Sequence, residues 1–198
     1  MNTTVAEPYT HKQADPYASP WSFTHRLKLL LWEYVWIIFC SWTPKPANRW
    51  RLFWLKLFGA KIYGTPFVHQ RARIQIPWRI ILHHQACLGD RANAYSLGII
   101  EIYEHATIAQ EVYLCTGTHA FDQPAMNLIT APIVIGPNAF IGARAFIMPG
   151  VTVGIKAIVG ACSVVTRNVA PYSVVVGTPA QEISNIKHKN GCDKNLNI

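Results

Sequence analysis

Aliphatic residues recur at every sixth position through the second half of the chain. The unbroken series consists of Ile135, Ile141, Ile147, Val153, Val159 and Val165. Four of these six anchors are followed directly by glycine, namely Gly136, Gly142, Gly154 and Gly160. A period of six matches neither the α-helix, which repeats every 3.6 residues, nor the flat strand, which repeats every two. Because the glycines share the register, a chance run of aliphatic residues does not explain the pattern.

The same spacing appears earlier in the chain with two interruptions. It runs through three series, which are Ile62, Val68, Ile74 and Ile80, then Leu88, Ala94 and Ile100, then Ile102, Ile108 and Leu114. The phase slips by two residues after Ile80 and again after Ile100, and we expect a corner insertion at each of these points.

This repeat predicts a mainly β solenoid over residues 61–183. Each coil is a triangle of three short strands whose aliphatic anchors point inward, and stacked coils pair as parallel strands. The turn glycines are expected to allow sharp bends and positive φ. Leu114 and Ile135 are 21 residues apart, which is not a multiple of six, so the chain leaves the coil in an excursion loop at 116–132.

An apolar and aromatic segment precedes the repeat. Residues 27–42 are intensely apolar, but their uninterrupted part, 34–40, is far shorter than the roughly 20 residues that span a bilayer. After a Pro-x-Pro break, a second helix is predicted over 47–59, with apolar side chains near one face and cations available to the other. These side chains are Trp50, Phe53, Trp54, Leu57 and Phe58 on the apolar side, and Arg49, Arg51 and Lys56 on the basic side. We therefore expect a poorly ordered arm at 1–20, a helical pair at 21–60 and a C-terminal tail at 184–198.

Two interpretations of the helical pair stay open. In the first, the helices pack on the main domain or on a neighbouring subunit. In the second, residues 21–58 make peripheral contact with an anionic membrane, since Trp-rich faces flanked by cations suit such a surface.

The charge of the chain belongs mainly to this segment. Of the net charge of +8, residues 21–62 carry seven Lys/Arg against one acid, which leaves only +2 for the remainder. This concentration argues against a nucleic-acid partner. The five cysteines are scattered and form no C-x-x-C pair, so a reducing cytosol fits better than a disulfide framework or a metal clip.

Three segments carry a resemblance to a known family. They are LCTGTHAF at 114–121, PIVIGPNAFIGARAFIMPGVTVG at 132–154 and VVGTPA at 175–180. With them the chain resembles the hexapeptide-repeat acyltransferases over residues 21–183, most of all the sugar O-acetyltransferases of the colanic acid biosynthesis branch. Galactoside, maltose and nodulation acetyltransferases are more distant kin. The resemblance implies a left-handed parallel β-helix, a homotrimer, acetyl-CoA as co-substrate and active sites between neighbouring subunits.

The resemblance also implies that the excursion loop carries the catalytic histidine, which is His119 here. A neutral imidazole can take the proton of a sugar hydroxyl while the oxygen attacks the thioester, and this chemistry needs no metal. Many relatives have an acid directly after the histidine, where this chain has Ala120. The group that orients the imidazole therefore stays open between Asp122, Glu111, Glu104 and a backbone carbonyl. Cys115 raises the alternative of an acyl-enzyme, which we rank below direct attack.

Positions for the two substrates follow from the same resemblance. Matching positions for CoA are Gly142, Ala143, Gly160, Ala161, Thr166, Arg167, Gly177, Thr178 and Pro179. Candidates for the acceptor are Asn93, Tyr95, Ser96, Asp122 and Met126. The function expected is acetyl transfer to a free, nucleotide-linked or lipid-linked sugar in cell-surface polysaccharide biosynthesis. The expected place is the cytoplasm, with the inner face of the plasma membrane as a peripheral site.

Two other functions compete with this prediction. A γ-type carbonic anhydrase uses the same solenoid with three zinc-bound histidines, but no two histidines here stand five apart on successive hexads. The other competitor is a non-catalytic hexapeptide scaffold, which predicts that CoA does not bind.

Overall fold

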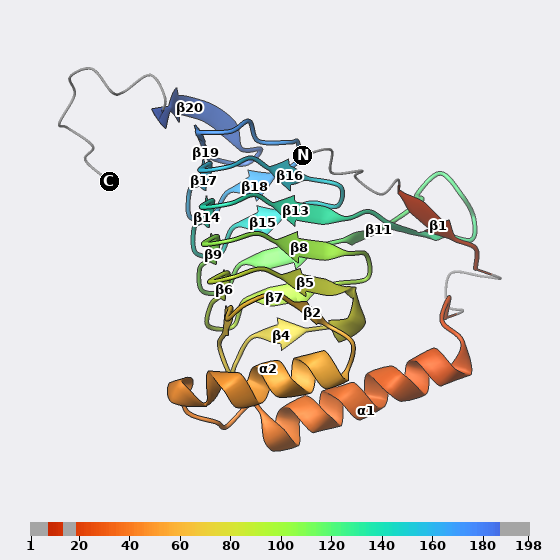
Figure 1. The fold of residues 1–198 in the computed structure, drawn as a ribbon. Helices are drawn as coiled ribbons and strands as arrows, with labels where there is room; N and C mark the ends of the chain where they lie inside the picture. The colour runs from red at the N-terminus through yellow and green to blue at the C-terminus, as the bar shows by residue number, and fades with distance from the viewer. Residues whose placement is uncertain (1–7, 14–18, 187–198) are drawn as a thin grey trace.

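The chain forms a left-handed parallel β-helix of about six turns with two helices at one end (Figure 1). The computed structural model describes residues 8–13 and 19–186. Part of the expected arm and nearly all of the expected tail lie outside these residues. The mainly β fold with an N-terminal helical pair, predicted from the six-residue period and the family resemblance, is confirmed.

Three sheets form the sides of the triangular coil. Sheet I contains β2 (Lys61–Ile62), β5 (Ile80–Leu82), β8 (Ile100–Ile102), β13 (Ile133–Ile135) and β16 (Thr152–Val153). Sheet II contains β3 (Phe67–Val68), β6 (Cys87–Leu88), β9 (Thr107–Ile108), β14 (Phe140–Ile141), β17 (Ile158–Val159), β19 (Ser173–Val176) and the antiparallel β20 (Gln181–Asn185). Sheet III contains β4 (Arg73–Ile74), β7 (Asn93–Tyr95), β10 (Tyr113–Cys115), β15 (Phe146–Ile147) and β18 (Val164–Val165).

The aliphatic anchors stack inside this triangle. In sheet III, for example, Ile74 pairs with Ala94, and Ala94 pairs with Leu114, so each anchor lies over the one in the coil below. These three side chains are buried. The column is the hydrophobic core that the period predicted.

The first two-residue insertion lies one corner earlier than the sequence suggested. Leu82 pairs with Ile62 as the anchor of sheet I, so the extra residues fall between Ile74 and Leu82. The short 3-10 helix η2 (Pro77–Arg79) occupies this corner between sheets III and I. Ile80 also points inward and is buried, and for this reason the sequence alone assigned it to the wrong register.

The repeat glycines have a different role from the one expected. They do not adopt positive φ. At these corners the residue with positive φ stands two positions after the glycine, as Asn138 does after Gly136 and Arg144 after Gly142. A Cβ on Gly142 would stand 2.6 Å from the backbone nitrogen of Ala161 in the next coil. Glycine is therefore required because coils approach too closely for a side chain.

The two helices close one end of the solenoid. Helix α1 (Phe23–Phe39) begins at Ser22, whose side chain accepts a hydrogen bond from the amide of His25, and it buries Trp32, Val35 and Trp36. The indole nitrogen of Trp32 donates to the carbonyl of Ile74 at 2.8 Å, which fastens the helix to the first coil. Among the described residues, no helix has the length and apolar character that crossing a bilayer requires.

Helix α2 (Asn48–Leu57) follows a 3-10 turn, η1 (Lys45–Ala47), and corrects one expectation. Arg51, predicted on an available basic face, is fully buried. Its guanidinium donates to the carbonyls of Val68, Pro44 and Lys45 and to Oγ1 of Thr43. A buried cation is tolerated here because these acceptors satisfy it. Arg51 thus joins α2 to the solenoid instead of facing solvent.

Candidate active site

The excursion from the coil is a β-hairpin that leaves the corner between sheets III and I. Strand β11 (Gly117–His119) pairs antiparallel with β12 (Leu128–Thr130), and His119 stands opposite Leu128. At the root of the hairpin, buried Thr116 donates through Oγ1 to the carbonyl of Tyr95 in the coil below. The hairpin is therefore anchored to the solenoid on the side that carries β7.

A third strand comes from the N-terminal segment. Strand β1 (Tyr9–His11), within the arm for which we expected no regular structure, pairs antiparallel with β12 (Figure 1). Beyond it, the Gln13 amide donates to Oδ1 of Asn127, and the Leu128 amide donates to Oε1 of Gln13. These contacts cover the outer edge of the hairpin that carries His119.

His119 has a defined orientation. Its Nδ1 lies 2.7 Å from the carbonyl oxygen of Met126 across the hairpin. A carbonyl only accepts, so Nδ1 carries the proton in this contact and Nε2 of the neutral ring has a free lone pair. The side chain is exposed, and Met126 itself has a φ of 45°. Of the orienting groups that the sequence left open, a backbone carbonyl makes this contact.

The acidic candidates for that role lie elsewhere. Glu104 pairs with Nδ1 of His83 at 3.2 Å, and Glu111 accepts from Nε of Arg144 at 2.6 Å. Asp122 is exposed near the tip of the hairpin. The charge of Glu111 is held by Arg144, whose hydrogen bond lowers the pKa of this carboxyl.

Cys115 lacks the environment of a nucleophile. Burial raises the pKa of its thiol, and its Sγ donates to the carbonyl of Gly117 at 3.2 Å. A thiol that stays protonated is a poor nucleophile. This supports direct attack on the thioester over an acyl-enzyme.

The acceptor candidates separate into two groups. Asn93 and Tyr95 point outward from β7, in the coil beneath the hairpin, and Met126 and Asp122 belong to the hairpin itself. Ser96 is different, because it is fully buried and its hydroxyl bonds the amide and the carbonyl of Ile76. Ser96 therefore holds the corner together and is not placed to contact an acceptor.

Most positions expected for CoA form one ridge at the corner between sheets II and III. Along the solenoid axis it runs from Gly142 and Ala143 through Gly160 and Ala161 to the segment 177–179. Within this ridge, Gly142, Ala143, Gly160 and Ala161 carry no side chain beyond Cβ, so a narrow chain such as pantetheine can approach the backbone there. Gly142 itself is demanded by coil stacking, whereas Gly177 has a φ of 100° and an added Cβ there would meet only the Pro179 oxygen at 3.6 Å.

Thr166 and Arg167 do not join this ridge. They follow β18 and lie exposed at the corner between sheets III and I, the same corner from which the hairpin of His119 leaves. A six-residue side of the coil corresponds to about 20 Å of extended chain. In one chain, the ridge and His119 are therefore separated by the width of sheet III.

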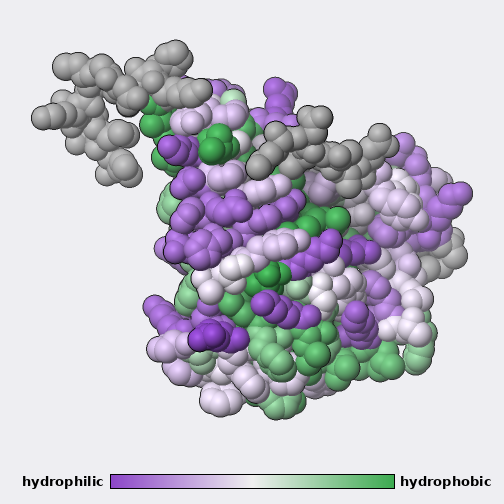
Figure 2. Space-filling view, viewed as in Figure 1, coloured by the Kyte–Doolittle hydropathy of each residue, from purple (hydrophilic) through white to green (hydrophobic). Residues whose placement is uncertain are grey.

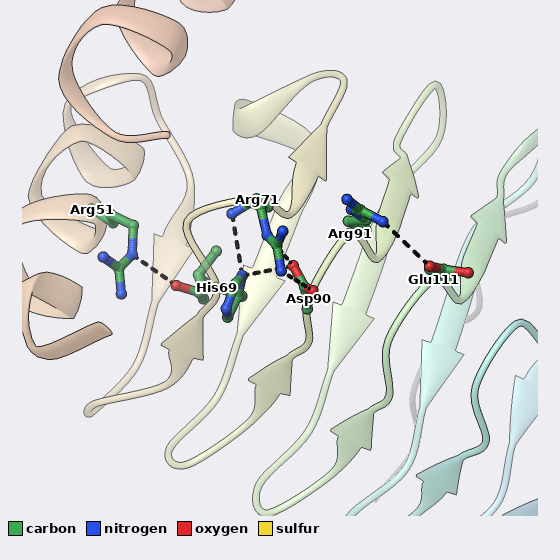
Figure 3. Close-up of polar contacts among 7 residues, drawn as sticks. Arg51, His69, Arg71, Asp90, Arg91 and Glu111 are labelled. Atoms are coloured by element: carbon green, nitrogen blue, oxygen red, sulfur yellow. Dashed lines mark hydrogen bonds and ion pairs between the residues drawn. The ribbon is translucent and has the colours of Figure 1, made fainter. Parts of the chain in front are cut away.

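A charged ladder continues the ridge toward the helices, and the sequence did not point to it. His69 Nδ1 lies 3.1 Å from Asp90, which also binds Arg71, and Arg91 lies 3.7 Å from Glu111 (Figure 3). The members come from successive coils. A spacing of about twenty residues between charged side chains was therefore the signal from which the sequence could have predicted the ladder. The last of them, Arg144, adjoins Ala143 and places an exposed cation beside the ridge.

Two histidines of the solenoid, His69 and His83, each face a carboxylate. His83 lies between Tyr63 and Tyr103 and faces Glu101 through Nε2 at 2.8 Å. Within residues 8–13 and 19–186, no three His, Cys, Asp or Glu side chains gather as a metal site.

Comparison with known proteins identifies relatives that cover most of the chain. The family model described as the hexapeptide repeat of succinyl-transferase matches residues 132–167. The chain is 38% identical over 154 residues to the Escherichia coli (strain K12) protein named "Putative colanic acid biosynthesis acetyltransferase WcaF". This match covers 78% of the chain and 85% of that protein.

Solved structures show the same architecture. A maltose O-acetyltransferase from Clostridium difficile 630 superposes with a TM-score of 0.72 at 25% identity, covering 83% of this chain and 89% of that one. A hexapeptide-repeat-containing acetyltransferase from Vibrio cholerae O1 biovar eltor, complexed with acetyl-CoA, gives a TM-score of 0.74. It is 23% identical, with 85% of this chain and 92% of that one covered, and so shows the fold.

Proposed function

The chain belongs to the hexapeptide-repeat acetyltransferases, and from this premise we propose that it moves the acetyl group of acetyl-CoA to a sugar hydroxyl with His119 as general base. The observation that carries the catalytic role is the 2.7 Å contact of His119 Nδ1 with the Met126 carbonyl. It leaves the second ring nitrogen available and fixes the direction in which its lone pair points.

The reaction proceeds by direct attack. Nε2 of His119 takes the proton of the acceptor hydroxyl while the oxygen forms a bond with the thioester carbonyl carbon. The resulting oxyanion collapses, the carbon–sulfur bond breaks, and CoA leaves as the thiolate. The proton on the imidazolium then passes to that thiolate, which restores the neutral ring. Every step uses groups of the protein and the two substrates.

A sugar is the acceptor that the surroundings support. Asn93 and Tyr95 offer an amide and a phenol on the outer side of β7, beneath the hairpin, and such groups suit hydroxyl-rich ligands. The named role of the Escherichia coli relative in colanic acid biosynthesis points to a cell-surface polysaccharide. We place the reaction in the cytoplasm, because the four described cysteines are free, as in a reducing compartment.

The active site is completed between copies of the chain. The backbone ridge for CoA and the hairpin of His119 occupy different corners of one coil, so one protomer does not bring them together. A homotrimer in which the ridge of one copy faces the hairpin corner of its neighbour joins the two halves. This arrangement also gives Thr166 and Arg167 a place beside the CoA of the adjacent copy.

The test is CoA release from acetyl-CoA against a panel of free, nucleotide-linked and lipid-linked sugars, with mass spectrometry of the products. We expect one class of sugar to gain a single acetyl group, and His119→Ala to lower kcat about 10²- to 10⁴-fold. The CoA dissociation constant of this variant should stay within about threefold of the native value. Undiminished kcat in His119→Ala would remove the histidine from the mechanism. Absence of CoA binding would favour the scaffold, and one tightly held zinc per subunit would favour the carbonic anhydrase.

A further inference from the structure

The outer sides of the two helices form an apolar surface at one end of the solenoid. We call this surface the basal face and define it by Leu27, Leu31, Tyr34 and Ile38 of α1, Trp42, and Phe53 of α2. All six side chains are exposed, and Trp42 has 73% of its surface accessible. Figure 2 shows the apolar colour gathered along the helices, whereas the coils above are largely polar on this side.

The basal face is a consequence of how α1 packs. Leu27, Leu31, Tyr34 and Ile38 follow a spacing of four, three and four residues, which places them along one side of the helix. The opposite side carries Trp32 and Trp36, which are buried against the solenoid. Trp32 and Trp36 thus pack α1 on the first coil, and the apolar residues on the other side of the helix have no role in the core.

The polar ends of the exposed tryptophans are already satisfied. The indole nitrogen of Trp42 donates to the carbonyl of Ile38 at 2.6 Å, and that of Trp50 donates to the carbonyl of Phe39 at 2.8 Å. Their rings therefore need no water to complete a hydrogen bond. A contiguous exposed apolar patch rimmed by polar residues is typical of an interaction site.

Cations surround the basal face. Exposed Arg26 lies on α1, and Lys45, Arg49 and Lys56 lie on or beside α2. Lys28 of α1 is directed to the solenoid instead, where its ammonium lies 4.1 Å from the ring centroid of Trp78. The only acid between residues 21 and 62 is Glu33. None of these four rim cations forms an ion pair with another residue in the described parts of the chain. Arg51 does not belong to this rim, because it is buried.

We propose that the basal face docks on the surface of an anionic lipid bilayer. The apolar side chains enter the boundary between headgroups and acyl chains, and the rim of cations faces the lipid phosphates. Helix α1 lies across the end of the solenoid, held by Trp32 and Trp36, so it lies in the plane of the surface. A second copy meeting this face about a twofold axis brings two rims of like charge together, which disfavours that occupant.

Docking in this way orients the molecule. The coils stack away from the helices, so the solenoid axis stands upright on the bilayer (Figure 1). Strand β10, from which the hairpin of His119 continues, lies two coils beyond β4 in sheet III, or about 10 Å. A sugar linked to a lipid headgroup can reach that height. This consequence rests on the proposed acetyl transfer, whereas the docking itself does not.

Vesicle flotation of the full chain tests the proposal. The wild type should float with vesicles of phosphatidylglycerol and phosphatidylcholine, and far less with phosphatidylcholine alone or in 0.5 M salt, where ionic attraction is screened (about 4 Å Debye length). The triple variant Leu27→Gln/Leu31→Gln/Ile38→Gln should lose at least about tenfold of its partition coefficient. The matched control is Ile155→Gln/Ile183→Gln, which changes exposed aliphatic residues at the other end of the solenoid. It should partition as the wild type does.

Two further measurements separate the explanations. The tryptophan emission of the wild type should shift to shorter wavelength with the anionic vesicles, since Trp42 of the basal face leaves water. Turnover of a soluble acceptor should be the same in the triple variant as in the wild type. A wild type that binds vesicles but shows no turnover would contradict the proposed reaction and leave the docking proposal intact. Two results overturn the docking proposal. In the first, the triple variant floats with the vesicles as well as the wild type does. In the second, the wild type does not bind vesicles, and the triple variant has a lower oligomeric mass than the wild type. The latter result would identify a second copy as the occupant.

Discussion

The carbonyl of Met126 accepts the Nδ1–H of His119 across the turn of a hairpin that lies outside the solenoid. This contact assigns the proton to one ring nitrogen and turns the other toward open space. It depends on the backbone of residue 126, which has a φ of 45° in the left-handed region.

Substitutions at Met126 should therefore separate by their backbone preference. Met126→Val should lower kcat about tenfold, because a β-branched residue at positive φ costs roughly 1–2 kcal/mol and displaces the carbonyl. Met126→Gly should keep kcat within about threefold, since glycine accepts this φ. Steady-state kinetics of both variants checks the prediction. Equal loss in both would mean that the side chain, and not the carbonyl, matters.

Removal of the Gln13 side chain should loosen the catalytic hairpin. Gln13→Ala deletes the acceptor of the Leu128 amide, opposite His119. We expect faster hydrogen exchange at Leu128 and a loss of about 1 kcal/mol in local stability. Lys12→Ala, which changes a neighbouring exposed side chain, is the control. Unchanged exchange in Gln13→Ala would show that β1 does not support the hairpin.

Cys115 should be dispensable for chemistry. Because its thiol is protonated and bonded to the Gly117 carbonyl, Cys115→Ser should keep kcat within about threefold and should show no acyl-enzyme by mass spectrometry. A loss comparable to that of His119→Ala, together with a trapped acetyl-cysteine in the wild type, would reinstate the nucleophile.

Gly142→Ala should destabilise the solenoid whether or not CoA is present. The added Cβ would stand 2.6 Å from Ala161 N and 2.8 Å from Gly160 C, both of them backbone atoms. Such overpacking costs about 1–3 kcal/mol and should appear as a lower Tm. Ala143→Ser, at the half-exposed neighbouring position, should keep the Tm. A variant that keeps its stability and loses only CoA affinity would assign Gly142 to the ligand.

Arg51→Met should be strongly destabilising, by about 3 kcal/mol or more. Methionine fills similar space but leaves the carbonyls of Val68, Pro44 and Lys45 without their donor. Urea denaturation measures the loss. Arg49→Met, which changes an exposed cation two residues earlier, should lie within about 0.5 kcal/mol of the wild type.

The local sequence pattern was sufficient to predict burial at positions where the residue type and its spacing indicate a single environment. The spacing of Ile135, Ile141 and Ile147 predicted inward-pointing anchors, and all three are buried. It was insufficient where two candidates look alike: Ile80 and Leu82 are both aliphatic, and only the pairing of Leu82 with Ile62 identifies the anchor. Likewise, the sequence alone predicts that a cation such as Arg51 lies on the surface. Only its hydrogen-bond acceptors in the structure show that it is buried.

The sequence by itself determined the architecture of this protein, because a six-residue aliphatic period is a local signal that only a triangular coil satisfies throughout. It also singled out His119, whose catalytic role stays a prediction. Tertiary structure alone decided which groups meet. Tyr9 pairs with Thr130, and Ser96 closes on Ile76. The physical reason is that a hydrogen bond depends on atoms within about 3 Å of each other. A spacing of one coil indicates which coils are neighbours but not which atoms meet, and a partner such as Tyr9 leaves no signal in the repeat.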